Sequence, residues 1–235
     1  MAGRLAGARV VVTGASRGLG RAIAEAAAGE GARLVVTATR VEHLGSLTAV
    51  LRDRGAEVHP LALELGDPVS VRAAAAEAVA ALGRVDGLVN NAGLLGERTA
   101  LADYPLDVWQ RVMAANVTGT LGMIQALLPA MPPGAAIVNV TSGAAARAGW
   151  GAYGVSKLAV DGMTRMLREE LADREIRCVA VNPGATRTAM RAAAYPREDP
   201  ATVPHPSART GAFIAILEGA DPGPWIEAGD WSPEP

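Results

Sequence analysis

Cysteine, phenylalanine and lysine each occur once in this chain of 235 residues, and histidine occurs three times. The single Cys178 excludes an internal disulfide framework and fits a reducing compartment, so we expect a cytoplasmic protein. His43, His59 and His205 lie far apart with no carboxylates at ligand spacing, so no metal site is expected. The net charge is −2 and both signs are interspersed, so we expect no nucleic-acid partner.

Residues 112–146 contain no charged side chain, a property that membrane spans share. Three prolines and a glycine between positions 129 and 134 interrupt this stretch in its middle. The apolar run at residues 10–12 ends at Thr13-Gly14, which is too short for a signal-peptide core. The pattern therefore predicts a buried helix, a turn and a buried strand, and no association with a membrane.

Arginine supplies all the positive side chains except one, and the exception is Lys157. If arginine replaces lysine wherever charge alone matters, the retained lysine is expected where a compact ammonium with rotatable donors is needed. Chance survival of a single lysine is the alternative.

Short β-branched runs alternate with longer alanine-rich stretches up to about residue 182, which is typical of βαβ units. Half of the residues are hydrophobic, enough for a sizeable core. We expect an α/β protein: a single doubly wound, Rossmann-like domain over residues 1–235, with a parallel sheet of about six to seven strands and helices on both faces. The expected strands are residues 8–13, 33–38, 57–62, 86–90, 135–140 and 176–181.

Prolines punctuate the chain after Pro183, and we expect residues 186–210 to form a lid over the substrate. A plain surface loop would show the same proline spacing. The tail from Gly219 is rich in Pro, Gly and Trp, and we expect it to be irregular and to lie at a subunit contact.

The first expected strand runs into Thr-Gly-Ala-Ser-Arg-Gly-Leu-Gly at residues 13–20, and a helical run follows at once. Glycines allow the backbone to approach a pyrophosphate closely, and the helix presents free N–H groups and the positive end of its dipole. This loop predicts a dinucleotide phosphate cradle; a purely structural turn is the alternative. The absence of a Lys-Ser/Thr pair disfavours ATP hydrolysis.

The second expected strand ends at Thr37-Ala38-Thr39-Arg40, where an NAD site would place a carboxylate for the ribose 2′-hydroxyl. Arg17 and Arg40, helped by the Thr39 hydroxyl, would instead meet a 2′-phosphate. We therefore expect NADP(H) to be preferred over NAD(H). A solvated charge at a helix start is the alternative for Arg40.

Tyr153 and Lys157 lie four residues apart in a helical stretch, which places both side chains on one helix face. A free phenol has a pKa of about 10, and an adjacent ammonium is expected to lower that pKa by favouring the phenolate. The pair predicts proton transfer, although isolated pairs with this spacing are mostly structural.

These motifs, taken in order, resemble the short-chain dehydrogenase/reductase family over residues 5 to about 190. The resemblance implies hydride transfer between NADP(H) and a small-molecule carbonyl or alcohol substrate, with Tyr153 as general acid or base. It also implies that Ser142 holds the carbonyl oxygen, that Lys157 lowers the pKa of Tyr153 and grips the ribose, and that Asn116 holds a water in the proton relay. Family members assemble through the helices that carry Asn116 and Tyr153, so we expect a homodimer or homotetramer.

The motifs and the resemblance together define the expected site. The expected catalytic residues are Asn116, Ser142, Tyr153 and Lys157. The expected cofactor-binding residues are Gly14, Ser16, Arg17, Gly18, Leu19, Gly20, Thr39, Arg40, Glu64, Leu65, Asn90, Ala92, Gly93, Tyr153, Lys157, Pro183, Gly184 and Thr188. The expected substrate-binding residues are Ser142, Trp150, Tyr153 and Met190, with Leu94, Leu95, Arg147 and Tyr195 extending the wall. For Asn90 the alternative is a structural role between neighbouring strands.

Three features depart from the family pattern. Ser142 stands two residues closer to Tyr153 than is usual, with Thr141 as the fallback hydroxyl, and Glu64 replaces the usual aspartate at the adenine. The short C-terminal end lacks the glycine-rich closing strand of 3-oxoacyl carrier-protein reductases, which weakens the alternative of a 3-oxoacyl-thioester reductase. An alternative of another class is a nucleotide-sensing protein without chemistry, which the presence of both Tyr153 and Lys157 disfavours.

Overall fold

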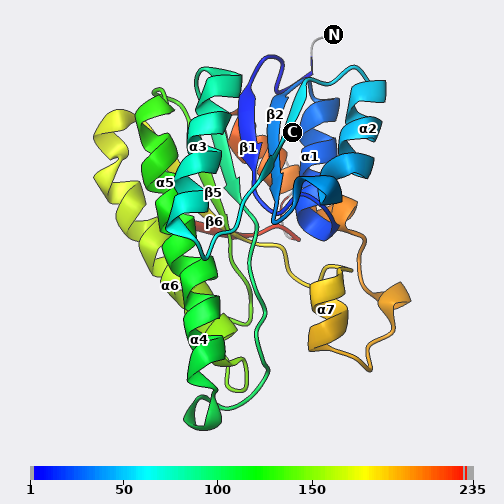
Figure 1. The fold of residues 1–235 in the computed structure, drawn as a ribbon, viewed down its shortest axis with the longest axis vertical. Coiled ribbons are helices and arrows are strands. Elements are labelled where there is room, and N and C mark those ends of the chain that lie inside the picture. The colour runs from blue at the N-terminus through cyan, green and yellow to red at the C-terminus, as the bar shows by residue number, and fades with distance from the viewer. Residues whose placement is uncertain (1–2, 230, 232–235) are drawn as a thin grey trace.

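The computed structural model describes residues 3–229 and 231, and its centre is one parallel sheet of seven strands (Figure 1). The strands are β1 (Arg9–Val12), β2 (Arg33–Ala38), β3 (Val58–Ala62), β4 (Gly87–Asn90), β5 (Ala136–Val140), β6 (Arg177–Asn182) and β7 (Trp225–Glu227). Their order across the sheet is β3-β2-β1-β4-β5-β6-β7, and neighbouring strands are parallel throughout. The doubly wound α/β domain and the six strands expected from the sequence are confirmed.

The central strands are continuous apolar runs because helices cover both faces of the sheet. Every residue of β4 and β5 is buried, as is usual for parallel strands. The chain runs outward from β1 to β3 and then returns to place β4 on the other side of β1. Such a change of direction leaves a crevice at the carboxyl ends of the two strands, where open α/β sheets bind ligands.

The helices form two groups, one on each face. The α-helices are α1 (Gly18–Gly29), α2 (Gly45–Asp53), α3 (Pro68–Leu82), α4 (Leu106–Met113), α5 (Thr120–Leu127), α6 (Gly151–Glu170), α7 (Ala189–Ala194) and α8 (Gly211–Glu218). A π-helical turn (Ala114–Gly119) joins α4 to α5, and 3-10 turns lie at Val41–Leu44, Leu101–Asp103, Leu128–Ala130, Ala172–Arg174, Pro200–Thr202 and Pro206–Arg209. Helices α1, α2 and α8 share one apolar core with the sheet, and α3, α5 and α6 share the other (Figure 1).

The uncharged stretch folds as the sequence predicts, into a helix, a turn and the buried strand β5. The helical segment Leu106–Ala130 is long and apolar enough to cross a membrane by length and composition alone. In this fold α5 packs on α3, and α4 packs on α6. These contacts bury part of the apolar surface of this segment against neighbouring helices.

The C-terminal tail corrects two expectations. It was expected to be irregular and to lack a closing strand, but β7 pairs in parallel with β6, with Val181 opposite Ile226. The N–H of Ala180 also donates to the carbonyl oxygen of Pro224 at 2.9 Å. The open edge of β6 supplies hydrogen-bond partners that local proline and glycine content does not reveal, so pairing overrides propensity.

The segment expected to form a lid is helical in part, since it contains α7 and two 3-10 turns. It projects from the sheet below α1 and α2 in Figure 1, beyond the carboxyl end of β6.

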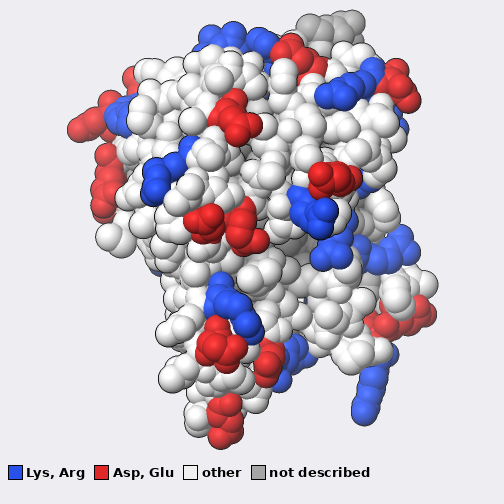
Figure 2. All heavy atoms as spheres, viewed as in Figure 1, with Lys and Arg blue, Asp and Glu red and all other residues white. Residues whose placement is uncertain are grey.

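Elsewhere on the surface, Figure 2 shows acidic and basic side chains intermingled on one face, without a wide patch of either sign. That face agrees with the interspersed charges of the sequence.

Candidate active site

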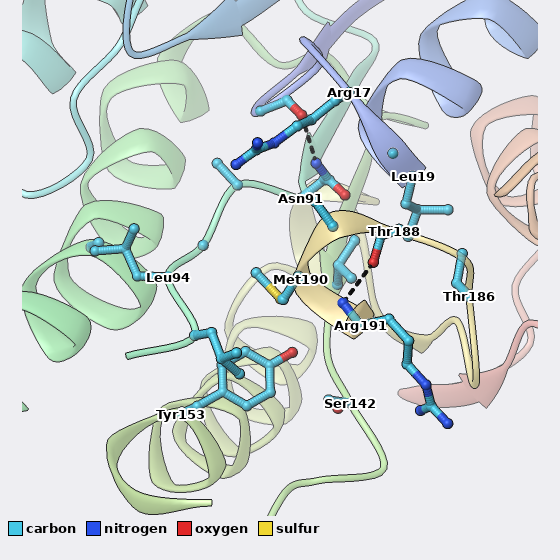
Figure 3. Close-up of a pocket in the computed structure, with 18 of the residues that line it drawn as sticks. Arg17, Leu19, Asn91, Leu94, Ser142, Tyr153, Thr186, Thr188, Met190 and Arg191 are labelled. Carbon is cyan, nitrogen blue, oxygen red and sulfur yellow. Dashed lines mark hydrogen bonds between the residues drawn. The ribbon is translucent and has the colours of Figure 1, made fainter. Parts of the chain in front are cut away.

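A cavity of about 850 Å³ opens at the carboxyl ends of β1 and β4, where the strand order changes direction (Figure 3). Its walls come from the segments that follow strands β1 to β6 and from helices α6 and α7. The predicted site residues that line it are Gly14, Ser16, Arg17, Gly18, Leu19, Thr39, Glu64, Leu65, Ala92, Gly93, Ser142, Trp150, Tyr153, Lys157, Pro183, Gly184, Thr188 and Met190. Five predicted residues are not part of this lining: Gly20, Arg40, Asn90, Asn116 and Arg147.

The glycine loop has the conformation that its composition predicts. Gly14 and Gly18 have φ angles of 66° and 60°, in the left-handed region that favours glycine. Helix α1 begins at Gly18, which lines the cavity with Leu19, so the free N–H groups of its first turn lie at the cavity wall. A Cβ at Gly20 would lie 2.4 Å from the carbonyl oxygen of Gly14 and 2.4 Å from Nδ2 of Asn91. Gly20 therefore permits close packing behind the loop.

The side chains of two consecutive asparagines point in opposite directions at the end of β4. Asn91, which was not predicted as a site residue, lines the cavity and donates from Nδ2 to the carbonyl oxygens of Thr13 (2.9 Å) and Gly14 (3.1 Å). Asn90 is buried and donates to Oδ1 of Asn139 at 2.9 Å. Successive strand residues point to opposite sides, and this alternation is the signal that could have separated the two. Asn91 holds the glycine loop, and Asn90 ties β4 to β5.

The end of β2 differs from the expectation at one arginine. Arg17 and Thr39 line the cavity as expected. The Arg40 side chain is 72% exposed, and its Nε lies 3.4 Å from Oε2 of Glu42, outside the lining. His43 lines the cavity instead, because the 3-10 turn after Arg40 brings the chain back towards it. Arg40 thus occupies the solvated position that was its alternative.

Tyr153 and Ser142 lie at the end of the cavity away from Arg17 in the view of Figure 3, and Lys157 also lines the cavity. Tyr153 and Lys157 share one face of α6, and the Lys157 Nζ lies 5.7 Å from the centroid of the Tyr153 ring. Ser142 follows β5, and its Oγ accepts a hydrogen bond from the N–H of Ala144 at 3.1 Å. Thr141 is buried and directs its hydroxyl to the carbonyl oxygen of Lys157 at 3.4 Å. The shortened loop therefore still brings Ser142 to the tyrosine.

Burial controls the protonation of this group. It raises the pKa of the Tyr153 phenol above its ordinary value of 10.0, while a hydrogen bond with Ser142 opposes the rise. Burial also lowers the pKa of Lys157 from 10.5 to about 8, and the charge of Asp161 opposes that fall. The Lys157 Nζ donates to the carbonyl oxygen of Val140 at 2.7 Å. The expected lowering of the Tyr153 pKa is wrong for this structure, because desolvation of the phenolate dominates.

Asn116 lies in the π-helical turn and uses its side chain within the protein. Its Oδ1 accepts from the N–H of Leu94 at 2.7 Å, and its Nδ2 donates to the carbonyl oxygen of Leu94 at 2.9 Å and to Oγ of Ser156 at 3.0 Å. A Cβ at Gly93 would lie 3.1 Å from this Oδ1. Asn116 therefore fixes the segment after β4 and lies behind the cavity wall.

The substrate side is apolar and partly aromatic. Trp150, Tyr153 and Ala194 belong to one buried cluster, against which Met190 and Tyr195 pack. Leu94 and Leu95 also line the cavity, as expected, whereas the expected Arg147 is exposed and outside the lining.

Comparisons with known proteins agree with this geometry. The chain matches the family described as short chain dehydrogenase over residues 8–199. It is 37% identical over 205 residues to an Escherichia coli protein named uncharacterized oxidoreductase YciK, with 84% of this chain and 81% of that protein covered. It is 35% identical over 194 residues to the 3-alpha-(or 20-beta)-hydroxysteroid dehydrogenase of Mycobacterium tuberculosis, with 81% and 73% covered. A short chain dehydrogenase from Burkholderia cenocepacia in complex with NADP matches with a TM-score of 0.84 and 31% identity, over 96% of this chain and 98% of that chain.

A doubly wound sheet with a cleft at its change of strand order, and a tyrosine and a lysine on one helix at the end of that cleft, define a class of Rossmann-like oxidoreductases. This chain belongs to the short chain dehydrogenase family of that class. Enzymes of this family act on small-molecule substrates.

Proposed function

We propose that the protein is an NADP(H)-dependent carbonyl reductase or alcohol dehydrogenase. The observation that supports this proposal is that Tyr153, Ser142 and Lys157 line the same cavity as the glycine loop. An arrangement of this kind serves hydride and proton transfer to a carbonyl group. A nucleotide sensor without chemistry would not need these three groups together.

The described residues fit a dinucleotide. The glycine loop and the first turn of α1 suit the pyrophosphate, and Glu64 and Leu65 lie where the adenine would be held. At the end of β2 the lining offers Thr39 and His43 and, among the described residues there, no carboxylate, and the loop after β1 adds Arg17. This set favours a 2′-phosphate. The remaining cofactor contacts are assigned to Ser16, Ala92, Gly93, Pro183, Gly184 and Thr188, all at the cavity.

A bound nicotinamide supplies the hydride that goes to the carbonyl carbon in reduction. Tyr153 keeps its proton at neutral pH because burial raises its pKa, so its phenol donates that proton to the carbonyl oxygen. Ser142 holds the same oxygen by a hydrogen bond. The Lys157 ammonium stabilises the phenolate left behind and donates to the ribose.

Replacement of Tyr153 by phenylalanine tests this function. Tyr153→Phe should bind NADPH as the parent does and lose most turnover, because it removes only the transferable proton. NADPH oxidation with a panel of ketones and NADPH binding by energy transfer from tryptophan give the two readouts. Full turnover in this variant would refute the proton-transfer role.

Cofactor choice is tested separately with Arg17. Replacement of Arg17 by glutamine should weaken the binding of NADPH at least about tenfold more than the binding of NADH, which corresponds to about 1.4 kcal/mol. Equal weakening of both would mean that Arg17 contacts the shared pyrophosphate. Matched replacement of Arg40 should have a smaller effect on NADPH binding, because Arg40 lies outside the cavity lining.

A 3-oxoacyl-thioester reductase is a second candidate, and β7 supports keeping it, because the missing closing strand was the reason to disfavour it. Faster turnover of an acyl thioester than of simple ketones would favour this candidate.

Exposed apolar side chains, Leu106 on α4 and Leu158 and Met166 on α6, support assembly of copies through these helices as a homodimer or homotetramer. Sedimentation of the purified protein tests the assembly.

A further inference from the structure

The helix of the lid segment is too short to hold its own position. Helix α7 has six residues, of which only Ala194 is buried. Isolated helices of this length are unstable in water, so α7 depends on contacts with its surroundings. Thr188 caps its first turn by accepting from the N–H of Arg191 at 3.1 Å, and Arg191 pairs with Glu198. These contacts lie within the lid segment and do not attach it to the rest of the domain.

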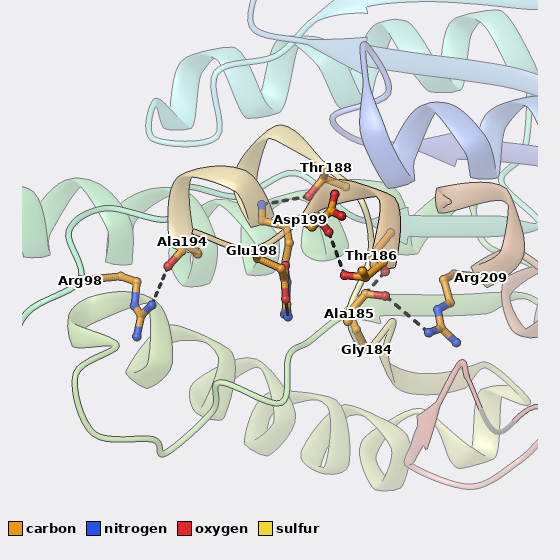
Figure 4. Close-up of polar contacts among 11 residues, drawn as sticks. Arg98, Gly184, Ala185, Thr186, Thr188, Ala194, Glu198, Asp199 and Arg209 are labelled. Carbon is orange, nitrogen blue, oxygen red and sulfur yellow. Dashed lines mark hydrogen bonds and ion pairs between the residues drawn. The ribbon is translucent and has the colours of Figure 1, made fainter. Parts of the chain in front are cut away.

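Arg98, from the segment that follows β4, adds a polar attachment to the packing of Ala194 against Trp150 and Tyr153. Its Nη1 donates to the carbonyl oxygen of Ala194, the last residue of α7, at 2.6 Å (Figure 4). Its guanidinium carbon lies 4.3 Å from the centroid of the Trp150 ring and 5.2 Å from that of Tyr195. The two rings are 5.7 Å apart. One side chain therefore joins the lid helix, the residue before α6 and the segment after β4.

The opposite end of the lid segment, Pro206–Arg209, packs on α1. Arg209 Nη2 lies 3.4 Å from the carbonyl oxygen of Ala185 (Figure 4).

A cation at the carboxyl end of a helix also meets the negative end of its dipole, which favours Arg98 at Ala194. Within residues 3–229 and 231, Arg98 has no ion pair, so its charge serves the two ring faces and the helix end.

We propose that Arg98 is a positioning residue that holds α7, Trp150 and Tyr195 as one wall and thereby sets substrate specificity. The wall is apolar, and Met190 packs beside it. The two nearby guanidinium groups already have partners: Arg98 contacts the Ala194 carbonyl and the two rings, and Arg191 forms an ion pair with Glu198. Such a wall suits an uncharged ketone with a flat apolar group beside the carbonyl. This assignment of substrate class rests on the proposed function. The role of Arg98 in holding α7 does not.

Replacement of Arg98 is tested with two readouts, and Arg197→Ala is the control because Arg197 is an exposed arginine of the lid segment itself. In Arg98→Ala, amide hydrogen exchange in residues 189–195 should be at least about tenfold faster, because α7 opens more often. The KM for 1-acetylnaphthalene should rise about tenfold, or about 1.4 kcal/mol, with little change in kcat. The KM for acetone and the Kd for NADPH should stay within about twofold.

The conservative variant separates positioning from folding. Arg98→Lys keeps a cation and a donor for the Ala194 carbonyl but has no planar face for the rings, so it should show a partial effect in both readouts. It also serves if Arg98→Ala does not fold. Unchanged exchange in residues 189–195 in the variant that folds would overturn the positioning role, and an unchanged KM for 1-acetylnaphthalene would overturn the specificity role. If the parent protein reduces neither ketone, the proposed function fails, and the exchange experiment still decides whether Arg98 holds α7.

Discussion

Lys157 is required by the proposed chemistry, yet its charge should destabilise the fold. The side chain is 5% exposed, and burial lowers its pKa from 10.5 to about 8. At about 1.4 kcal/mol per pKa unit, this corresponds to about 3 kcal/mol by which folding disfavours the ammonium. Lys157→Met removes that cost and also removes the hydrogen bond to the Val140 carbonyl, worth about 1 kcal/mol. The variant should therefore be inactive and, near neutral pH, about 2 kcal/mol more stable than the parent.

The stability difference should depend on pH in a defined direction. Between pH 8 and 10.5 the unfolded parent keeps a proton on Lys157 that the folded parent has lost, so the parent gains stability as the pH rises. Below pH 8 the full cost of the buried ammonium is present. From pH 7.5 to pH 9.5 the advantage of Lys157→Met should shrink by about 2 kcal/mol, and the two proteins should become about equally stable.

Denaturant unfolding of both proteins at pH 7.5 and pH 9.5 measures these differences. Arg165→Met on the same helix is the control, because Arg165 is exposed and its loss should change stability by less than about 0.5 kcal/mol at either pH. A stability difference between Lys157→Met and the parent that does not change with pH would refute the account of a buried, destabilising ammonium.

Three further predictions concern packing. Gly20→Ala places its Cβ 2.4 Å from the Gly14 carbonyl oxygen, so it should lower the unfolding free energy by about 1–3 kcal/mol and weaken the binding of NADPH. Gly29→Ala, in the same helix with open space around it, should be neutral or stabilising. Equal effects of the two substitutions would contradict the packing argument. Asn90→Ala should lower the unfolding free energy by about 1–3 kcal/mol without changing NADPH affinity, and a loss of affinity would place Asn90 in the site. Burial raises the pKa of Cys178 to about 12, so a thiol reagent at pH 8 should label it only after unfolding, and rapid labelling of the native protein would show that the thiol is accessible.

Features that depend on short spacing could be predicted from the sequence. The alternation of β-branched and alanine-rich runs predicts the parallel sheet, because strand and helix preferences act over a few residues. The glycines at 14 and 18 predict the tight turn before α1, and the four-residue spacing of Tyr153 and Lys157 places them on one helix face. Ser142 could also be placed, because β5 carries it to the end of the sheet.

Features that depend on side-chain direction or on distant partners could not be predicted in the same way. Arg40 was expected beside Arg17, but the turn that follows β2 exposes it and brings His43 to the cavity. The strand β7 forms because β6 offers an open edge more than forty residues earlier in the chain. Arg98 carries no local motif, and its role depends on two rings and a helix end from other segments.

The sequence by itself determined the fold class, and it predicted the glycine loop and the candidate pair Tyr153 and Lys157, because each of these depends on residues a few positions apart. The tertiary structure decided which asparagine holds the glycine loop, which arginine contacts the end of α7, and the direction in which the pKa of Tyr153 shifts. The physical reason is that burial and long-range contact arise only when distant segments pack together, and for Tyr153 desolvation then outweighs the hydrogen bond with Ser142.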